Sequence, residues 1–426
     1  MTRIRTWRRG SSFVTAGVAT ALAVTVVGAG GAAGGAPAAA SAQPATARNV
    51  IFVNGDGMAA AQREAGRLAG VGLDGDLEMD RLPQAGLLTT DSRDPKAFVT
   101  DSAAGASAWA TGQKTYNGAI SVDVDKNPLP VLGQQAKDAG KATGLVTTAQ
   151  VTDASPAAFF SRTADRKSQD EIARQYLEES KPDVILGGGE DWWLPAGAAG
   201  AFPDTPPEDA EEASKGTKGD LVARARELGY AYASTPEQLQ QAGGPKLLGL
   251  FANEEMFQQK PEGQGDVYAP VVDLPTMTQK ALDTLAAGPN GFFLFVEEEG
   301  IDEFAHANNG GKMLEGVQQL DAAVAVARRY VAAHPDTLLV VTGDHECGGL
   351  TVNGADDPGL PGATGKDGPF PVKGSDKQFV LNWTTEEHTD VPVPVTAEGP
   401  GAEALTGQHP NTHVHGVLAG ALGVRT

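Results

Sequence analysis

The stretch Leu338-Leu339-Val340-Val341-Thr342-Gly343-Asp344-His345 decides the fold of this 426-residue chain. An apolar run that leads straight into polar residues is typical of a strand buried on both faces of a parallel sheet. Five further runs are equally short, rich in branched or aromatic residues, and bounded by Gly or polar residues. They are residues 50–53, 143–148, 184–186, 247–251 and 292–296.

Helical patterns lie between these runs. The clearest has apolar residues at helical spacing: Leu314, Val317, Leu320, Val324 and Ala327. Alternating strands and helices predict an α/β fold, a large doubly wound and mostly parallel sheet with helices on both faces. Residues 190–217 and 353–378 are rich in Gly, Pro and Asp, so we expect them to be surface insertions.

Composition and charge exclude several classes of protein. Hydrophobic residues make up 41% of the chain, which excludes a disordered protein, and the 54 glycines follow no collagen period. The net charge of −21 argues against a nucleic-acid-binding module, because Lys and Arg bind phosphate backbones, and it is compatible with cation binding. The single cysteine, Cys347, excludes an intramolecular disulfide and a multi-cysteine metal site.

The first 42 residues have the layout of an export signal. Four arginines precede an apolar run from Phe13 to about Val27, and small residues end the segment at Ala40-Ser41-Ala42. The Arg8-Arg9 pair is compatible with twin-arginine export, and the alternative is an anchor helix. We therefore expect a secreted, extracellular protein whose mature chain, 43–426, is a single catalytic domain without a transmembrane segment.

Polar residues follow four of the predicted strands. They are Asp56, Asp153 with Ser155, Glu297, and Asp344 with His345. A single carboxylate after a strand is ordinarily a turn residue or a helix cap. Because parallel strands place ligands at their carboxyl ends, four such positions together predict one site at that edge.

The histidines indicate a metal centre. All seven lie after residue 300, and Asp302-x-x-x-His306 places a carboxylate and an imidazole one helical turn apart. His388 stands just before another apolar stretch. Mixed Asp and His ligation without thiolate suits Zn²⁺ in a catalytic site. For His334 we favour a solvated helix cap, and for His413 and His415 a polar helix start.

Ser102 and Arg166 are candidates for phosphate chemistry. The small residues after Asp101-Ser102 predict a helix, whose N-terminus would favour an alkoxide and a bound phosphate. The alternative for Ser102 is plain N-capping, and since no histidine is near in sequence, a metal would have to activate it. A guanidinium can bind two phosphate oxygens, but Arg162 or Lys167 would serve as well by composition alone.

With these residues in place, the sequence closely resembles the alkaline phosphatase family, from about Asn49 to the C-terminus. The motifs match in order and spacing. They are Asn54-Gly55-Asp56-Gly57-Met58, Thr100-Asp101-Ser102-Ala103-Ala104, Asp153-Ala154-Ser155-Pro156, Val296-Glu297 with Ile301-Asp302 and His306, Thr342-Gly343-Asp344-His345, and Glu387-His388-Thr389.

This resemblance implies two zinc ions and one magnesium ion. One zinc would be held by Asp302, His306 and His388, and the other by Asp56, Asp344 and His345 with Ser102 as the exchangeable ligand. Magnesium would take Asp56, Ser155 and Glu297, with Asp153 in its outer shell through water. Ser102 would be the nucleophile, and Arg166, oriented by Asp101, would bind the phosphate.

The resemblance also implies the reaction. We expect hydrolysis of small phosphate monoesters through a phosphoserine, with broad specificity; the alternative is an enzyme dedicated to one phosphorylated metabolite or antibiotic precursor. The sulfatase motif does not occur at Ser102, and a non-enzymatic binding protein is disfavoured because every ligand position is filled. Glu303 departs from the family, where lysine, histidine or tryptophan is usual. The oligomeric state stays open, and a homodimer is compatible with the sequence.

Overall fold

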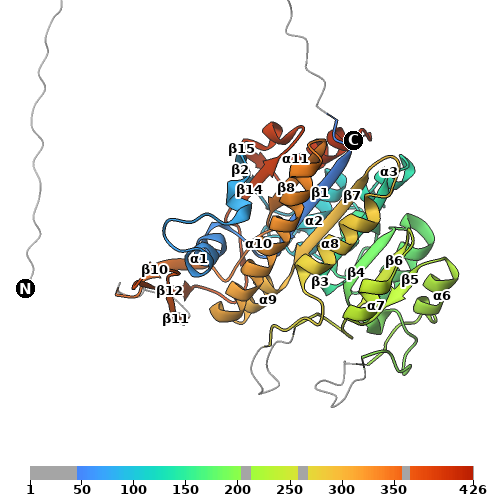
Figure 1. Ribbon diagram of the computed structural model, residues 1–426, viewed down its shortest axis with the longest axis horizontal. Coiled ribbons are helices and arrows are strands. Elements are labelled where there is room, and N and C mark those ends of the chain that lie inside the picture. The colour runs from blue at the N-terminus through green and yellow to red at the C-terminus, as the bar shows by residue number, and fades with distance from the viewer. Residues whose placement is uncertain (1–45, 203–212, 258–266, 357–364, 426) are drawn as a thin grey trace, which may run out of the picture. The chain divides into compact units, whose positions relative to one another are not determined.

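A ten-stranded sheet forms the centre of the protein (Figure 1). The computed structural model describes residues 46–202, 213–257, 267–356 and 365–425, so the predicted export signal, 1–42, lies outside the described residues. The strand order is β15-β2-β14-β8-β1-β7-β3-β4-β6-β5, and all neighbours from β8 to β5 are parallel. The predicted mostly parallel sheet is confirmed.

Six strands of the parallel part correspond to the six predicted apolar runs. Their bounds are β1 (Asn49–Gly55), β3 (Ala142–Gln150), β4 (Val184–Gly188), β6 (Leu247–Leu250), β7 (Phe292–Glu298) and β8 (Thr337–Thr342), and the short β5 (Ala231–Ala233) ends the row. Side chains alternate between two hydrophobic cores: Val50 and Phe52 join one, and Ile51 and Val53 join the other. Both faces of each strand are therefore buried, which explains the unbroken apolar runs.

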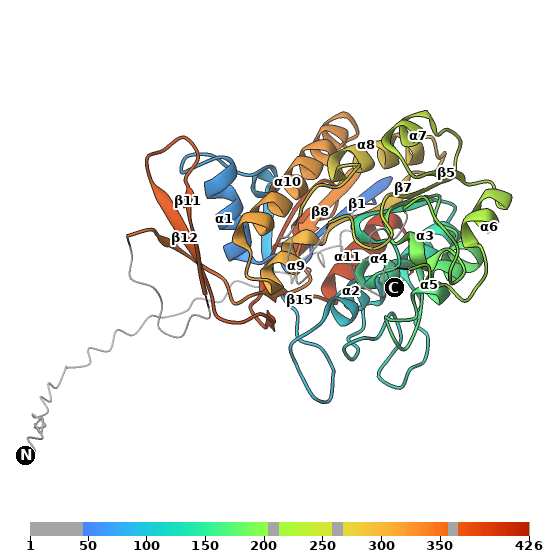
Figure 2. The ribbon, with the colours of Figure 1, turned by 90° about the horizontal axis from the view of Figure 1, so that it is seen from below.

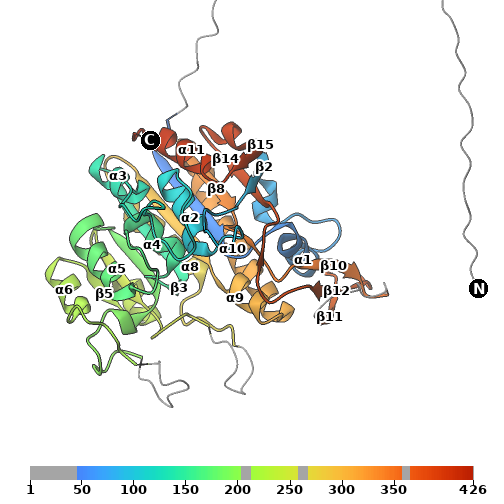
Figure 3. The same ribbon diagram turned by 180° about the vertical axis from the view of Figure 1, so that it is seen from behind.

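Helices cover both faces of the sheet (Figure 2). One face carries α1 (Ala60–Gly70), α7 (Pro236–Gln241), α8 (Leu274–Leu285) and α10 (Gly310–Ala333), and the other carries α2 (Ser102–Thr111), α3 (Leu132–Asp138), α4 (Ala154–Phe160), α5 (Gln169–Gln175) and α11 (His413–Leu422). Figure 3 shows the second layer from its own side. α6 (Leu221–Glu227) packs beside β5, and α9 (Gly300–His306) follows β7. Shorter helical turns span Glu78–Arg81, Tyr176–Ser180, Glu190–Trp192 and Ala402–Leu405.

The sheet has an antiparallel margin that the sequence analysis did not predict. β14 (Val393–Glu398) runs antiparallel to β8 and to β2 (Gln84–Thr89), and β15 (Gly407–Pro410) lies outside β2. Pro394 inside β14 and Gly86 inside β2 disfavour a strand assignment by pattern alone. The six parallel strands lack such interruptions by proline.

Two smaller sheets lie beside the main one. β10 (Thr351–Gly354), β12 (Gln378–Trp383) and β11 (Gly365–Pro371) form an antiparallel sheet, which takes in part of the predicted insertion 353–378. β9 (Glu346–Cys347) pairs with β13 (His388–Thr389). Residues 203–212 and 357–364 of the two predicted insertions lie outside the described residues. Among the helices that the structure describes, none combines the length and the apolar character needed to cross a membrane.

Candidate active site

The ends of four parallel strands lie in register and bring the predicted polar residues to one edge. Asn54 of β1 stands opposite Glu297 of β7 and Thr342 of β8, and Thr147 of β3 stands opposite Glu297 from the other side. The loops that follow β1, β3 and β8 therefore start at the same edge of the sheet. Their first polar residues meet there, as the rule for parallel sheets predicts.

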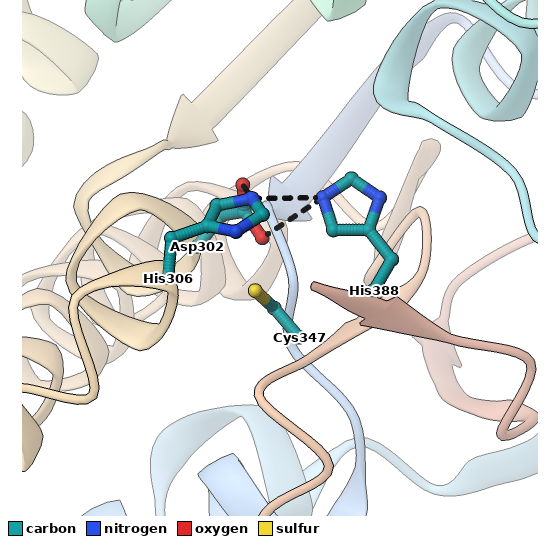
Figure 4. A group of neighbouring side chains, drawn as sticks. All are labelled: Asp302, His306, Cys347 and His388. Carbon is teal, nitrogen blue, oxygen red and sulfur yellow. Dashed lines mark hydrogen bonds and ion pairs between the residues drawn. The ribbon is translucent and has the colours of Figure 1, made fainter. Parts of the chain in front are cut away.

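The first group of the site consists of Asp302, His306 and His388 (Figure 4). The Nε2 atoms of the two histidines are 3.0 Å apart, and the Asp302 carboxylate lies 3.2 Å from His306 Nε2 and 3.6 Å from His388 Nε2. His388 Nδ1 contacts the Thr100 carbonyl at 2.9 Å, and His306 Nδ1 contacts the Glu386 carbonyl. Each outer nitrogen is thus held by the backbone, which leaves both Nε2 atoms directed at the carboxylate.

Cys347 is the fourth member of this group. Its sulfur and the ligand atoms of the other three residues all lie within 4.8 Å of one another. The β9–β13 pairing sets Cys347 opposite His388 in the strand register. Burial, followed by the charge of Asp302, raises the pKa of the thiol far above its ordinary value. The thiol is buried and lies beside the Asp302 carboxylate.

The second group surrounds His345. Its Nε2 atom lies 3.2 Å from Ser102 Oγ, 3.2 Å from Asp344 Oδ2 and 3.4 Å from Asp56 Oδ1, and all four residues are buried. Ser102 is the first residue of α2, and the preceding Asp101 accepts the capping hydrogen bond from the Ala104 amide at 2.9 Å. The N-capping alternative for Ser102 is therefore wrong, because Asp101 fills that role.

The third group lies beside Asp56. Glu297 accepts hydrogen bonds from Asn54 Nδ2 at 3.1 Å and from Thr147 Oγ1 at 2.7 Å. The Ser155 hydroxyl stands in the first turn of α4 and is buried. The sequence did not identify Asn54 and Thr147 as partners of Glu297. Their signal was their place at the ends of strands that flank β7.

Arg166 reaches the same edge. Its Nη2 atom lies 2.8 Å from Asp153 Oδ2, and its Nη1 atom lies 3.5 Å from Asp101 Oδ2. Arg162 instead donates to the Leu129 carbonyl, and Lys167 is exposed, with its backbone amide donating to the Asp165 carboxylate. Of the three cations that composition left open, Arg166 is the one ion-paired beside Ser102's helix.

The electrostatics of the edge favour bound cations. Burial, together with neighbouring carboxylates, raises the pKa of Asp344 to about 7 and that of Glu297 to about 8. Within the described part of the chain, five buried polar atoms of the expected metal-ligand residues have no hydrogen-bond partner. They are Asp56 Oδ1, Ser155 Oγ, Asp302 Oδ1, Asp344 Oδ2 and His345 Nδ1. Four of these are oxygens, and with the inward imidazoles they form a donor set that suits divalent metals.

The remaining histidines lie outside the groups described above. His334 ends α10 and its Nδ1 atom contacts the Tyr330 carbonyl, as expected for a helix cap. His413 and His415 stand in the first turn of α11, which confirms the interpretation as a helix start.

The alkaline phosphatase family model matches residues 47–372, which include most of this edge of the sheet. The chain belongs to the alkaline phosphatase family. It is therefore a phosphoric monoester hydrolase, and the metal-binding character of the site follows from the family and from the grouped ligands.

Relatives and solved structures agree with this assignment. The streptomycin-6-phosphate phosphatase of Streptomyces griseus is 36% identical over 98% of both chains. The alkaline phosphatase of Escherichia coli K12 is 32% identical over 89% of this chain and 87% of its own. A mutant alkaline phosphatase of the Antarctic bacterium TAB5, solved with Mg bound, superposes with a TM-score of 0.71 at 26% identity, over 90% of this chain and 100% of its own.

Proposed function

We propose that this alkaline phosphatase uses two zinc ions and one magnesium ion and acts through a phosphorylated Ser102. The observation that carries the proposal is the 3.2 Å separation of Ser102 Oγ and His345 Nε2, at a point where Asp56 and Asp344 also converge. A hydroxyl so placed among cation ligands, at a helix N-terminus, can be deprotonated without a general base.

The residues of the three groups fit the three ions. Asp302, His306 and His388 would hold one zinc, and Asp56, Asp344 and His345 the other, beside Ser102. Asp56, Ser155 and Glu297 would hold magnesium, with Asp153 outside them. When bound, such ions stabilise negative charge on attacking and leaving oxygens and lower the pKa of bound hydroxyl groups.

The reaction then follows from the chain's own groups. Ser102 Oγ attacks phosphorus, the Ser–O–P bond forms, and the bond to the leaving alcohol breaks. Arg166 binds two of the nonbridging oxygens, while its ion pairs with Asp101 and Asp153 hold the guanidinium in place. Water next cleaves the phosphoserine and releases inorganic phosphate. Two in-line displacements predict retention of configuration at phosphorus.

Export is part of the same proposal. Residues 1–42 would direct the chain out of the cytoplasm and be removed. N-terminal sequencing of the protein recovered from culture medium tests this. A mature chain starting near residue 43 supports secretion, and an intact N-terminus on cell-associated protein contradicts it.

One observation favours a dedicated enzyme over a broad one. The streptomycin-6-phosphate phosphatase matches along almost the whole of both chains. We propose, as the second candidate, that one phosphorylated antibiotic precursor is the main substrate. A kcat/KM for streptomycin 6-phosphate far above that for simple alkyl phosphates favours this candidate, and similar values favour broad specificity.

The central proposal is tested by trapping the intermediate. Protein incubated with phosphate at acidic pH, digested and analysed by mass spectrometry should carry one phosphate on the peptide that contains Ser102. A chelator should abolish hydrolysis of p-nitrophenyl phosphate, and zinc with magnesium should restore it. Phosphate on another residue, or activity that survives full metal removal, would falsify the proposal.

A further inference from the structure

Three glutamates gather beside the proposed magnesium group without belonging to it. Glu299 follows β7, Glu303 lies on α9, and Glu255 lies in the loop after β6. Thr148, near the end of β3, contacts two of these segments. Its Oγ1 atom accepts a hydrogen bond from the Glu299 backbone amide at 3.0 Å, and the Thr148 carbonyl accepts one from the Met256 backbone amide at 2.9 Å. The pKa of Glu299 is raised, mainly by burial and then by the negative charges of Asp153, Glu255 and Glu303.

Two buried acceptors in this cluster have no donor. Glu299 is 6% exposed and Gln150 is 8% exposed, and within the described residues neither Glu299 Oε2 nor Gln150 Oε1 has a hydrogen-bond partner. The Gln150 amide group donates to Glu255 Oε1 at 2.7 Å, which fixes its orientation and leaves its oxygen as the acceptor. An unsatisfied buried acceptor is costly, so both atoms point to a ligand that donates hydrogen bonds.

Two nearby positive charges in the described part of the chain are already engaged. Arg166 is ion-paired with Asp101 and Asp153, and Lys215 is ion-paired with Glu254 at 2.7 Å. Among the described residues, neither Glu255 nor Glu299 forms an ion pair with a lysine or an arginine. Within the described residues, the Glu255 and Glu299 carboxylates thus have no lysine or arginine as a counter-charge, and half-buried Glu255 and Glu303 open the cluster to the surface.

We propose that Gln150, Glu255 and Glu299 form a subsite for an ammonium or guanidinium group carried by the phosphate ester substrate. This inference rests on the proposed function, in which Arg166 binds the phosphate. Asp153 forms an ion pair with Arg166 and is also near enough to Glu299 for its charge to act on that carboxylate, so the subsite lies beside the phosphate position. A guanidinium has hydrogen-bond donors on several sides and no acceptor, so it is complementary to a subsite that offers only acceptor oxygens. Among the described residues, the groups of His, Cys, Asp and Glu ligands within 4.8 Å of one another all include Asp302, so these glutamates do not close around one small ion.

The test compares cationic and neutral substrates on the metal-loaded enzyme. We expect kcat/KM to rise along a series of ω-guanidinoalkyl phosphates until the chain length spans the distance to the subsite, while the matched alkyl phosphates show no such rise. Glu299→Gln and Glu255→Gln should each lower the ratio of cationic to neutral kcat/KM about tenfold, the value of one charge-assisted hydrogen bond. Comparing this ratio between each variant and the wild type cancels the effect of the leaving group and any general loss of activity, because both affect the two substrates of one variant or the two enzymes alike.

Glu254→Gln is the matched control, because it removes the same charge one residue from Glu255 but from a side chain paired with Lys215. The ratio should not change in this variant. Equal ratios in the wild type and both test variants would overturn the subsite. So would loss of one divalent ion per chain from Glu299→Gln, measured by metal analysis, since the ligand would then be a metal. Failure of the proposed function is separate, because it would remove hydrolysis of neutral and cationic esters alike.

Discussion

The Nε2 atom of His345 lies 3.2 Å from the Oγ atom of Ser102, and both side chains are buried at the carboxyl edge of the sheet. Burial, and then the charge of His388, holds the pKa of His345 well below its ordinary value. The imidazole is therefore neutral at physiological pH, with a lone pair available to a cation. This separates the site from a serine–histidine pair that relies on proton transfer, because Asp56 and Asp344 crowd the same nitrogen.

Ser102→Ala should abolish turnover and leave the metals in place. We expect kcat for p-nitrophenyl phosphate to fall at least about a thousandfold, since no other group can form the covalent intermediate. Zinc and magnesium content by mass spectrometry should match the wild type. Ser107→Ala is the control on the same helix. The Ser107 hydroxyl donates to the Ala119 carbonyl, so its loss should lower the free energy of unfolding by about 1 kcal/mol and leave turnover unchanged. Substantial turnover by Ser102→Ala would exclude this nucleophile.

Arg166→Ala should weaken phosphate binding. The guanidinium is held by Asp153 and Asp101, so its removal costs a preorganised bidentate contact, and we expect the inhibition constant for inorganic phosphate to rise about tenfold or more. Arg166→Lys should recover only part of this, because an ammonium cannot bind two oxygens in the same geometry. Lys167→Ala, next along the chain, should behave as the wild type. An unchanged inhibition constant in Arg166→Ala would show that Arg166 does not bind the phosphate.

The parallel half of the fold was predictable because each of its strands is buried on both faces. That burial selects short uninterrupted apolar runs such as 292–296, whose length and content of aromatic and β-branched residues distinguish them from a buried helix. The antiparallel margin was not predictable in the same way. β2 has one mostly exposed face and β14 contains Pro394, so their local pattern is weak and their pairing depends on β8.

The candidate site was predictable where residues stand directly after strands, as Asp56 and Asp344 do. Motif resemblance supplied His388, which lies on the short strand β13, and Arg166, which lies in the loop between α4 and α5. The proximity of Cys347 to Asp302 and the cluster of Glu255 with Glu299 could be recognised only from the structure. Glu255 lies 44 positions before Glu299 in the printed sequence, and only the contacts of both segments with Thr148 bring them together.

Glu303→Lys should tighten phosphate binding. Glu303 directly follows Asp302 on α9 and is one of the charges that raise the pKa of Glu299. Reversing its charge lowers the negative potential around the phosphate position, so we expect the phosphate inhibition constant and kcat to fall together if product release limits the rate. Glu315→Lys makes the same charge change at an exposed position on α10 and should alter neither. A wild-type inhibition constant and kcat in both variants would show that Glu303 does not affect phosphate binding.

Zinc affinity should rise with pH between about 7 and 10. In the metal-free site, burial tends to lower the pKa values of His306 and His388, but the Asp302 carboxylate outweighs it and raises them to about 10 and about 9. Both imidazoles are then protonated at pH 7 and must lose a proton before they can bind zinc. The buried carboxyl of Asp344, with a pKa of about 7, acts in the same direction. Every one of these protons competes with the metal, so apparent affinity falls as pH falls.

Calorimetric titration of the chelator-treated protein with zinc checks the sign directly. Repeating it at pH 7 in buffers of different ionisation enthalpy gives the number of protons released, which should be above zero and should decline toward pH 10. His413→Ala is a suitable control, because this histidine contacts the Ala404 carbonyl away from the site and its loss should leave the proton count unchanged. Zinc binding without proton release at pH 7 would mean that the imidazoles are neutral before the metal arrives. In that case Asp302 would not dominate their titration, and the electrostatic account of the first group would fail.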